Sequence, residues 1–150
     1  MQIEHSPEIE QLTQESYDAW ARGDSTWLAD HLSTEDPIML GSAPDEEIRG
    51  AEPIADGMGK ALASRESWGF KPTGRRIIDA RQCGDIGWSV AEQKWEFEDG
   101  SYLPTRGLTI WHYEDSRWKM VVGLVAPAFS DNLVHAGSPV TQPAEAAVST

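Results

Sequence analysis

The sequence has a single cysteine and no long apolar run, and these two absences exclude a disulfide within the chain and a membrane-spanning helix. Cys83 has no second cysteine to pair with, which excludes an intramolecular disulfide. The longest apolar run, Val121 to Phe129, is interrupted by Pro127 and falls well short of the roughly twenty residues that a membrane-spanning helix needs. The first residues also lack the charged and apolar regions of a signal peptide. We therefore expect a cytoplasmic protein that makes no contact with a membrane.

Basic residues are scarce as well. Twelve Lys and Arg stand against 25 Asp and Glu, and the formal net charge is -13. A field of this sign repels phosphate backbones, so nucleic acid is not an expected partner. Phe and Tyr occur three times each, whereas Trp occurs seven times. Trp side chains fill cores or form the walls of pockets, and a chain of 150 residues can bury a sizeable core without disulfides.

The patterns along the chain predict helices first and a β-meander second. Ser6-Pro7-Glu8 is typical of a helix start, with a capping side chain, proline in the first turn and then an acid. Apolar residues at helical spacing predict helices, and period-two alternation after Gly69 predicts strands. The expected helices are 7–22, 25–32 and 51–65, and the expected strands are 37–41, 70–81, 86–97, 103–113 and 118–126. This order is typical of an α+β fold.

The last part of the chain has a different composition. Residues 131–150 are rich in Ala, Pro, Ser, Thr and Val without any periodicity. Such a segment cannot bury enough apolar surface to become ordered. We therefore expect one domain over residues 1–130, followed by a disordered tail over 131–150.

Three stretches of sequence together resemble a known family. They are Ala-Trp-Ala-Arg-Gly-Asp at 19–24, Leu-Gly-Ser-Ala-Pro-Asp-Glu-Glu-Ile-Arg-Gly at 40–50, and Glu-Asp-Ser-Arg-Trp-Lys-Met-Val at 114–121. Over about residues 7–128, their order and spacing are similar to those of the SnoaL-like group of the nuclear transport factor two-like superfamily. The resemblance implies a cystatin-like cone, in which a curved antiparallel sheet wraps around three N-terminal helices and leaves a conical pocket. Because this superfamily contains isomerases, dehydratases, cyclases, epoxide hydrolases and non-catalytic modules, the fold leaves the activity open.

Several chemical groups of these relatives are missing here. The resemblance to ketosteroid isomerases implies an Asp base on the first short strand and a Tyr on the first helix, but those positions hold Gly41 and Ser16, the latter next to Tyr17. The H-x-H pair that many relatives carry on the last strand is replaced by Val122 and Leu124. We therefore expect an apolar pocket without a cofactor. No pair of histidines has metal-ligand spacing, so we also expect no metal.

The hairpin turns determine which side chains face the pocket. A two-residue turn at Asp99-Gly100 would place Glu92 opposite Gly107, and a turn at 114–117 would place Thr109 opposite Val122. A shift of one residue would exchange the two faces. With this register, the side chains predicted to line the pocket are Trp20, Met39, Trp68, Trp88, Val90, Thr109, Trp111, Val122 and Leu124.

Glu92 is the candidate catalytic residue. A carboxylate in an apolar cone would have a raised pKa and could act as a general acid or base. The alternative is a structural carboxylate paired with Lys94 or with a helix donor. The predicted function is the binding of a small apolar or aromatic molecule, with cofactor-free isomerase, cyclase or hydrolase activity left open. A non-catalytic dimerisation or binding module is the alternative.

The opposite face of the sheet is expected to carry a second set of apolar side chains. A contiguous apolar patch is rarely left in water, so this face predicts a homodimer. The alternative is that the segment around Phe129 and Leu133 covers the patch. The residues expected on this outer face are Trp95, Leu108, Ile110, Val121 and Val125.

Overall fold

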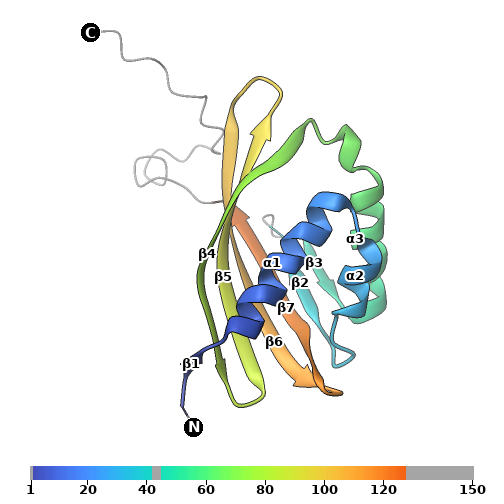
Figure 1. Ribbon diagram of the computed structural model, residues 1–150. Coiled ribbons are helices and arrows are strands. Elements are labelled where there is room, and N and C mark those ends of the chain that lie inside the picture. The colour runs from blue at the N-terminus through green and yellow to red at the C-terminus, as the bar shows by residue number, and fades with distance from the viewer. Residues whose placement is uncertain (1, 42–44, 128–150) are drawn as a thin grey trace, which may run out of the picture.

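The computed structural model describes residues 2–41 and 45–127 (Figure 1). The predicted order of helices first and meander second is confirmed. The N-terminal elements are β1 (Glu4–His5), α1 (Pro7–Arg22), α2 (Ser25–Asp30), β2 (Ile38–Leu40), β3 (Glu47–Arg49), α3 (Ala51–Ala63) and the 3-10 turn η1 (Arg65–Ser67). The long strands are β4 (Phe70–Cys83), β5 (Ile86–Phe97), β6 (Tyr102–Glu114) and β7 (Arg117–Pro127). The disordered tail expected at 131–150 lies outside the described residues.

The first two helices begin where their capping residues predict. The Ser6 hydroxyl accepts a hydrogen bond from the Ile9 amide at 3.3 Å, and Pro7 occupies the first turn. Helix α1 ends at Gly23, whose φ of 77° is a left-handed conformation that glycine adopts without strain. The Asp24 carboxylate then caps α2 by accepting from the Trp27 amide at 2.9 Å. These local bonds fix where the two helices begin and where α1 ends.

A single seven-stranded sheet holds the fold together, in the order β1-β4-β5-β6-β7-β2-β3. All neighbouring strands pair antiparallel except β2 and β7, which are parallel. The sheet curves around α1, while α2 and α3 lie together on the side of β2 and β3 (Figure 1). Bulges in β4 and between β6 and β7 help the long strands to bend. The sequence patterns did not reveal β1 and β3, which have only two and three residues.

The core lies between the helices and the concave face of the sheet. Ile9, Leu28 and Ile54, one from each helix, are fully or almost fully buried. Trp111 on β6 is also fully buried, and its indole Nε1 donates to the Ser89 hydroxyl at 3.3 Å. Trp111 is therefore part of the core, and the prediction that it lines a pocket was wrong. Among the described residues, none of the helices has the length and apolar character needed to cross a membrane.

Candidate functional site

The turn between β5 and β6 is one residue longer than predicted. The Phe97 amide donates to the Ser101 carbonyl at 2.9 Å, and the Gly100 amide donates to the Phe97 carbonyl at 3.0 Å. The loop therefore contains three residues, ending with Gly100 at a φ of 82°, instead of the two residues expected. As a result, Glu92 pairs with Arg106 and not with Gly107. The shift by one residue moves every β5 side chain to the opposite face from the one predicted.

A bulge causes a second shift, between β6 and β7. The pairing of Tyr113 with Trp118 at the turn agrees with the prediction. Beyond the bulge, however, Thr109 pairs with Gly123 rather than with Val122. Since the extra residue on β7 changes the alternation of the strand, Gly123 lies on the concave face and Val122 on the convex face.

Glu92 is a convex-face residue, so its predicted place in the pocket was wrong. Its Oε2 lies 2.7 Å from Arg76 Nη2, and its Oε1 lies 2.9 Å from Arg106 Nε. The hydrogen bonds from Arg76 and then from Arg106 lower the pKa of the Glu92 carboxyl below its ordinary value. A carboxylate bound by two guanidinium groups on the convex surface is not a candidate acid or base for the cone.

A cavity of about 460 Å³ lies between α1 and the concave face of the sheet. This volume is within the usual range for small-molecule sites. From the helical half and β4, its lining residues are Ser16, Tyr17, Trp20, Ala21, Met39, Gly41, Glu46, Trp68, Phe70 and Pro72. From β5, β6 and β7, they are Gln93, Trp95, Phe97, Leu103, Thr105, Gly107, Thr109, Met120, Gly123, Leu124 and Val125.

The predicted pocket residues divide into two groups. Those that border the cavity are Trp20, Met39, Trp68, Thr109 and Leu124. Leu124 does so through its backbone, because its carbonyl oxygen lies 3.5 Å from the β-carbon position of Gly107 while its pairing with Leu108 turns its side chain to the convex face. Those outside it are Trp88, Val90, Val122 and the core residue Trp111, because the two register shifts turn the first three away. The first shift also brings in Gln93, Trp95 and Phe97, of which Trp95 was expected on the outer face. The signal that could have found them is a loop over Glu98–Gly100 instead of a two-residue turn.

Aromatic side chains form one end of the cavity. Phe70 lies at the centre of this cluster, with ring centroids 5.3 Å from Trp68, 5.6 Å from Trp95 and 5.5 Å from Phe97. The same four residues border a second cavity of about 500 Å³, whose other lining residues include charged ones. These charged residues are Arg65, Glu66, Lys71, Glu96 and Glu98. The aromatic cluster therefore separates a charged outer region from the apolar interior.

Tyr17 provides a hydroxyl group inside the cavity. Its ring lies 5.6 Å from the Arg75 guanidinium carbon, and Arg75 is held by Asp18 at 2.7 Å. Burial raises the pKa of the Tyr17 phenol, partly offset by the charge of Arg75, so the group remains a protonated hydrogen-bond donor at neutral pH. Within residues 2–41 and 45–127, no hydrogen bond of this hydroxyl is found. A half-buried donor without a partner is available to a ligand or to water.

Gln93, Trp95 and Thr105, three polar residues on the β5 and β6 walls, already have protein partners. Gln93 Nε2 donates to the carbonyls of Gly74 and Lys94, at 2.8 and 2.9 Å. Trp95 Nε1 donates to the Thr105 hydroxyl at 3.0 Å, and that hydroxyl donates to the Gln93 carbonyl at 3.2 Å. These bonds fix the indole of Trp95 and leave the wall largely apolar.

Glu46 is the only carboxylate among the lining residues of this cavity in the described chain. Its carboxylate occupies the place where a β-carbon of Gly41 would be. The resemblance to ketosteroid isomerases implies an Asp base at the position of Gly41. The carboxylate therefore comes from a neighbouring residue, which comparison of single positions cannot reveal.

The curved sheet, the helices packed in it and the cavity between them define a cone of the nuclear transport factor two-like type. A model of the SnoaL-like domain family matches residues 9–123, and the chain belongs to this family. No curated protein matches the chain.

Solved structures support the fold. A domain with a cystatin-like fold from Nostoc punctiforme has a TM-score of 0.70 at 13% identity, covering 87% of this chain and 84% of its own. A nuclear transport factor two-like protein from Pseudomonas putida has a TM-score of 0.66 at 12% identity, covering 84% and 88%. A protein of the same type from Streptomyces avermitilis, provisionally assigned as a dehydratase, has a TM-score of 0.65 at 12% identity, covering 82% and 95%. At these identities, the likeness extends to the fold alone.

Proposed function

We propose that the cavity binds a neutral, largely apolar or aromatic small molecule that carries one hydrogen-bond acceptor. The observation that carries this proposal is the Tyr17 hydroxyl, a protonated donor that has no hydrogen-bond partner among the described residues and borders a largely apolar cavity. The aromatic side chains of Trp20, Trp68 and Trp95 offer flat surfaces for a ring system. An unpaired charge on the ligand would be expensive to bury there, which favours neutral molecules.

The test is a titration followed by tryptophan fluorescence, using acetonaphthone and its hydrocarbon analogue ethylnaphthalene. The two ligands have similar shapes, but only the ketone accepts a hydrogen bond. Tyr17→Phe should weaken ketone binding by about three- to tenfold, the value of one net hydrogen bond, and leave hydrocarbon binding unchanged. If the parent binds neither ligand saturably, the binding function is refuted. Equal weakening of both ligands would refute the donor role of Tyr17.

A second candidate function is cofactor-free proton transfer on such a ligand. The observation that favours it is the Glu46 carboxylate, which borders the same cavity as Tyr17. In this mechanism, Glu46 removes a proton from the carbon next to a carbonyl, and Tyr17 donates a hydrogen bond to the oxyanion that forms. Return of the proton to the same or another carbon completes an exchange or an isomerisation.

Exchange of acetonaphthone methyl protons with deuterated water, measured by NMR, tests this second candidate. The parent should accelerate the exchange, and Glu46→Gln should abolish the acceleration without abolishing ketone binding. Binding without acceleration would leave the chain as a binding protein. An accelerated exchange that survives Glu46→Gln would remove Glu46 from the mechanism.

We also propose that the convex face pairs two copies of the chain. Two cross-strand rows of apolar side chains run over β5, β6, β7 and β2 on this face. The rows are Trp88, Ile110, Val122 and Ile38, and beside them Val90, Leu108, Leu124 and Leu40. Leu108 and Ile110 were expected here, whereas Trp95 and Val125 border the cavity instead. An apolar face of this extent favours a two-fold dimer.

A further inference from the structure

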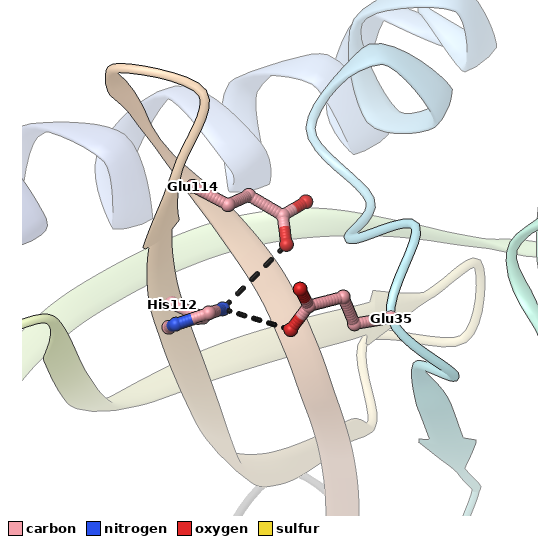
Figure 2. A group of neighbouring side chains, drawn as sticks. All are labelled: Glu35, His112 and Glu114. Atoms are coloured by element: carbon pink, nitrogen blue, oxygen red, sulfur yellow. Dashed lines mark ion pairs between the residues drawn. The ribbon is translucent and has the colours of Figure 1, made fainter.

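A histidine and two glutamates from different segments converge on the convex side of the sheet. His112 and Glu114 lie on β6, and Glu35 lies in the connection between α2 and β2 (Figure 2). His112 Nδ1 is 3.4 Å from Glu35 Oε2 and 3.5 Å from Glu114 Oε2. The candidate ligand atoms of the three residues all lie within 4.8 Å of one another. Because His112 alternates with the core residue Trp111, the cluster is separate from the cavity.

The distances in this cluster differ from those of ordinary hydrogen bonds. Both carboxylates approach the same ring nitrogen, which carries at most one proton and can donate well to only one of them. Both separations also exceed the usual range of about 2.7–3.2 Å for N–H···O bonds. Ligands about 2.0–2.2 Å from a tetrahedral zinc ion lie about 3.3–3.6 Å from one another. The separations at His112 Nδ1 match that edge length.

From this geometry we propose that Glu35, His112 and Glu114 bind a first-row divalent transition-metal ion, with Zn²⁺ as the representative, and that water completes the coordination. One imidazole nitrogen with two carboxylates is a donor set that suits zinc, whereas calcium and magnesium prefer oxygen ligands alone. The ion offsets the negative charge of two carboxylates that approach the same ring nitrogen.

Neighbouring residues orient the ligands. The Glu114 side chain is only 10% exposed, its Oε2 accepts from the Ser33 hydroxyl at 2.8 Å, and its Oε1 accepts from the Thr34 amide at 3.2 Å. On the other side of the ring, Asp85 Oδ2 lies 3.8 Å from His112 Nε2, on the side from which carboxylates support metal-bound histidines. The nearby Lys119 directs its ammonium group to the Asp30 carbonyl instead of into the cluster. The Glu35 side chain is 68% exposed and can move to complete the site.

A metal ion at this position joins the α2–β2 connection to the end of β6. The connection leads directly into β2, which supplies Met39 to the cavity wall and the apolar residues Ile38 and Leu40 to the convex face. The site thus has a structural role in holding the short edge of the sheet, because it joins Glu35 to two ligands on β6, a strand that lies far from Glu35 along the chain.

Isothermal titration of the full chain with zinc chloride tests the proposal. One ion should bind per chain, and both Glu35→Gln and His112→Gln should weaken binding by at least about tenfold. Glu10→Gln is the matched control, because Glu10 lies 3.3 Å from His5 as an isolated histidine–carboxylate pair on the surface. Cys83→Ser is the control for zinc binding by the free thiol. Both control variants should bind zinc as the parent does, within about twofold.

A second readout separates ligation from general stabilisation. Cobalt(II) bound to the parent should show the intense visible absorption of a four-coordinate ion, and His112→Gln should lose it while keeping the parent's far-UV circular dichroism. The proposal is overturned if the parent does not bind zinc below about 1 mM. It is also overturned if Glu35→Gln and His112→Gln bind as the parent does, or if Glu10→Gln or Cys83→Ser weakens binding as much as they do.

Discussion

The close approach of Gly107 to Tyr17 gives a prediction whose magnitude follows from the structure. A β-carbon added at Gly107 would lie 2.5 Å from the Tyr17 hydroxyl oxygen but 3.8 Å from the ring carbon that carries it. The first distance requires Tyr17 or the strand to move, whereas the second is an ordinary contact. Overpacking of this kind costs about 1–3 kcal/mol, and the low end applies because the cavity leaves Tyr17 room to turn.

Gly107→Ala should therefore lower the free energy of unfolding by about 1 kcal/mol in the parent. In a Tyr17→Phe background the obstructing oxygen is gone, and the same change should raise stability by about 0.5–1 kcal/mol because alanine restricts the unfolded chain. The coupling free energy between the two positions should be about 1.5–2 kcal/mol.

Urea denaturation followed by circular dichroism measures all four members of this cycle. Gly74→Ala is the matched control on β4, since its added β-carbon would meet only the Lys94 β-carbon at 3.8 Å. This control should show no coupling to Tyr17→Phe. A Gly107→Ala effect that is the same in both backgrounds, within about 0.5 kcal/mol, would refute the placement of the Tyr17 hydroxyl against β6.

Two further predictions concern the convex face. Glu92→Gln should reduce the free energy of unfolding by about 0.5–1 kcal/mol at neutral pH. The folded pKa of Glu92 lies below its ordinary value of 4.5, so this difference in stability should be present above pH 4.5 and disappear as the pH falls through the folded pKa. Urea denaturation at several pH values measures it. A difference that persists at low pH would contradict the ion pairing of Glu92. Light scattering of the parent at tens of micromolar should give the mass of a dimer, and Ile110→Glu should give a monomer, because it places a charge in the middle of an apolar row. A monomeric parent would refute the dimer.

The helix starts and the order of elements could be predicted because their causes are local. Ser6 and Asp24 each cap a helix through a hydrogen bond to a residue three positions further on, and Gly23 ends α1 by its own conformation. Neither signal depends on contacts made elsewhere in the fold. The same is true of the alternation that predicts each long strand.

The faces of the sheet could not be predicted because they depend on single-residue differences. The sequence Glu98-Asp99-Gly100-Ser101 is compatible with a two-residue turn and with the three-residue loop that forms. The bulge opposite Ile110 adds one residue to β7 without a distinctive sequence signature. The longer loop turns Glu92 outwards and Trp95 inwards, and the bulge turns Val122 outwards and Gly123 inwards.

The polar groups of the cavity and of the proposed metal site could not be predicted from single positions. They come from residues next to the position that the family resemblance indicates, or from residues far apart in the chain. Glu46 places its carboxylate at Gly41, and the hydroxyl of Tyr17 replaces the one expected at the position of Ser16. Glu35 approaches His112 only because the α2–β2 connection folds against the end of β6. Spacing along the sequence carries no information on such contacts.

The most direct test of the central claim is an acetonaphthone titration of two variants that each add one indole to β6. Thr109→Trp fills the cavity from its β6 wall, whereas Leu108→Trp, one residue away, points to the convex face. Tryptophan fluorescence should show saturable, one-to-one binding to the parent and to Leu108→Trp, and binding at least about tenfold weaker to Thr109→Trp. Equal affinities of Thr109→Trp and the parent would contradict the claim that the cone is the ligand site.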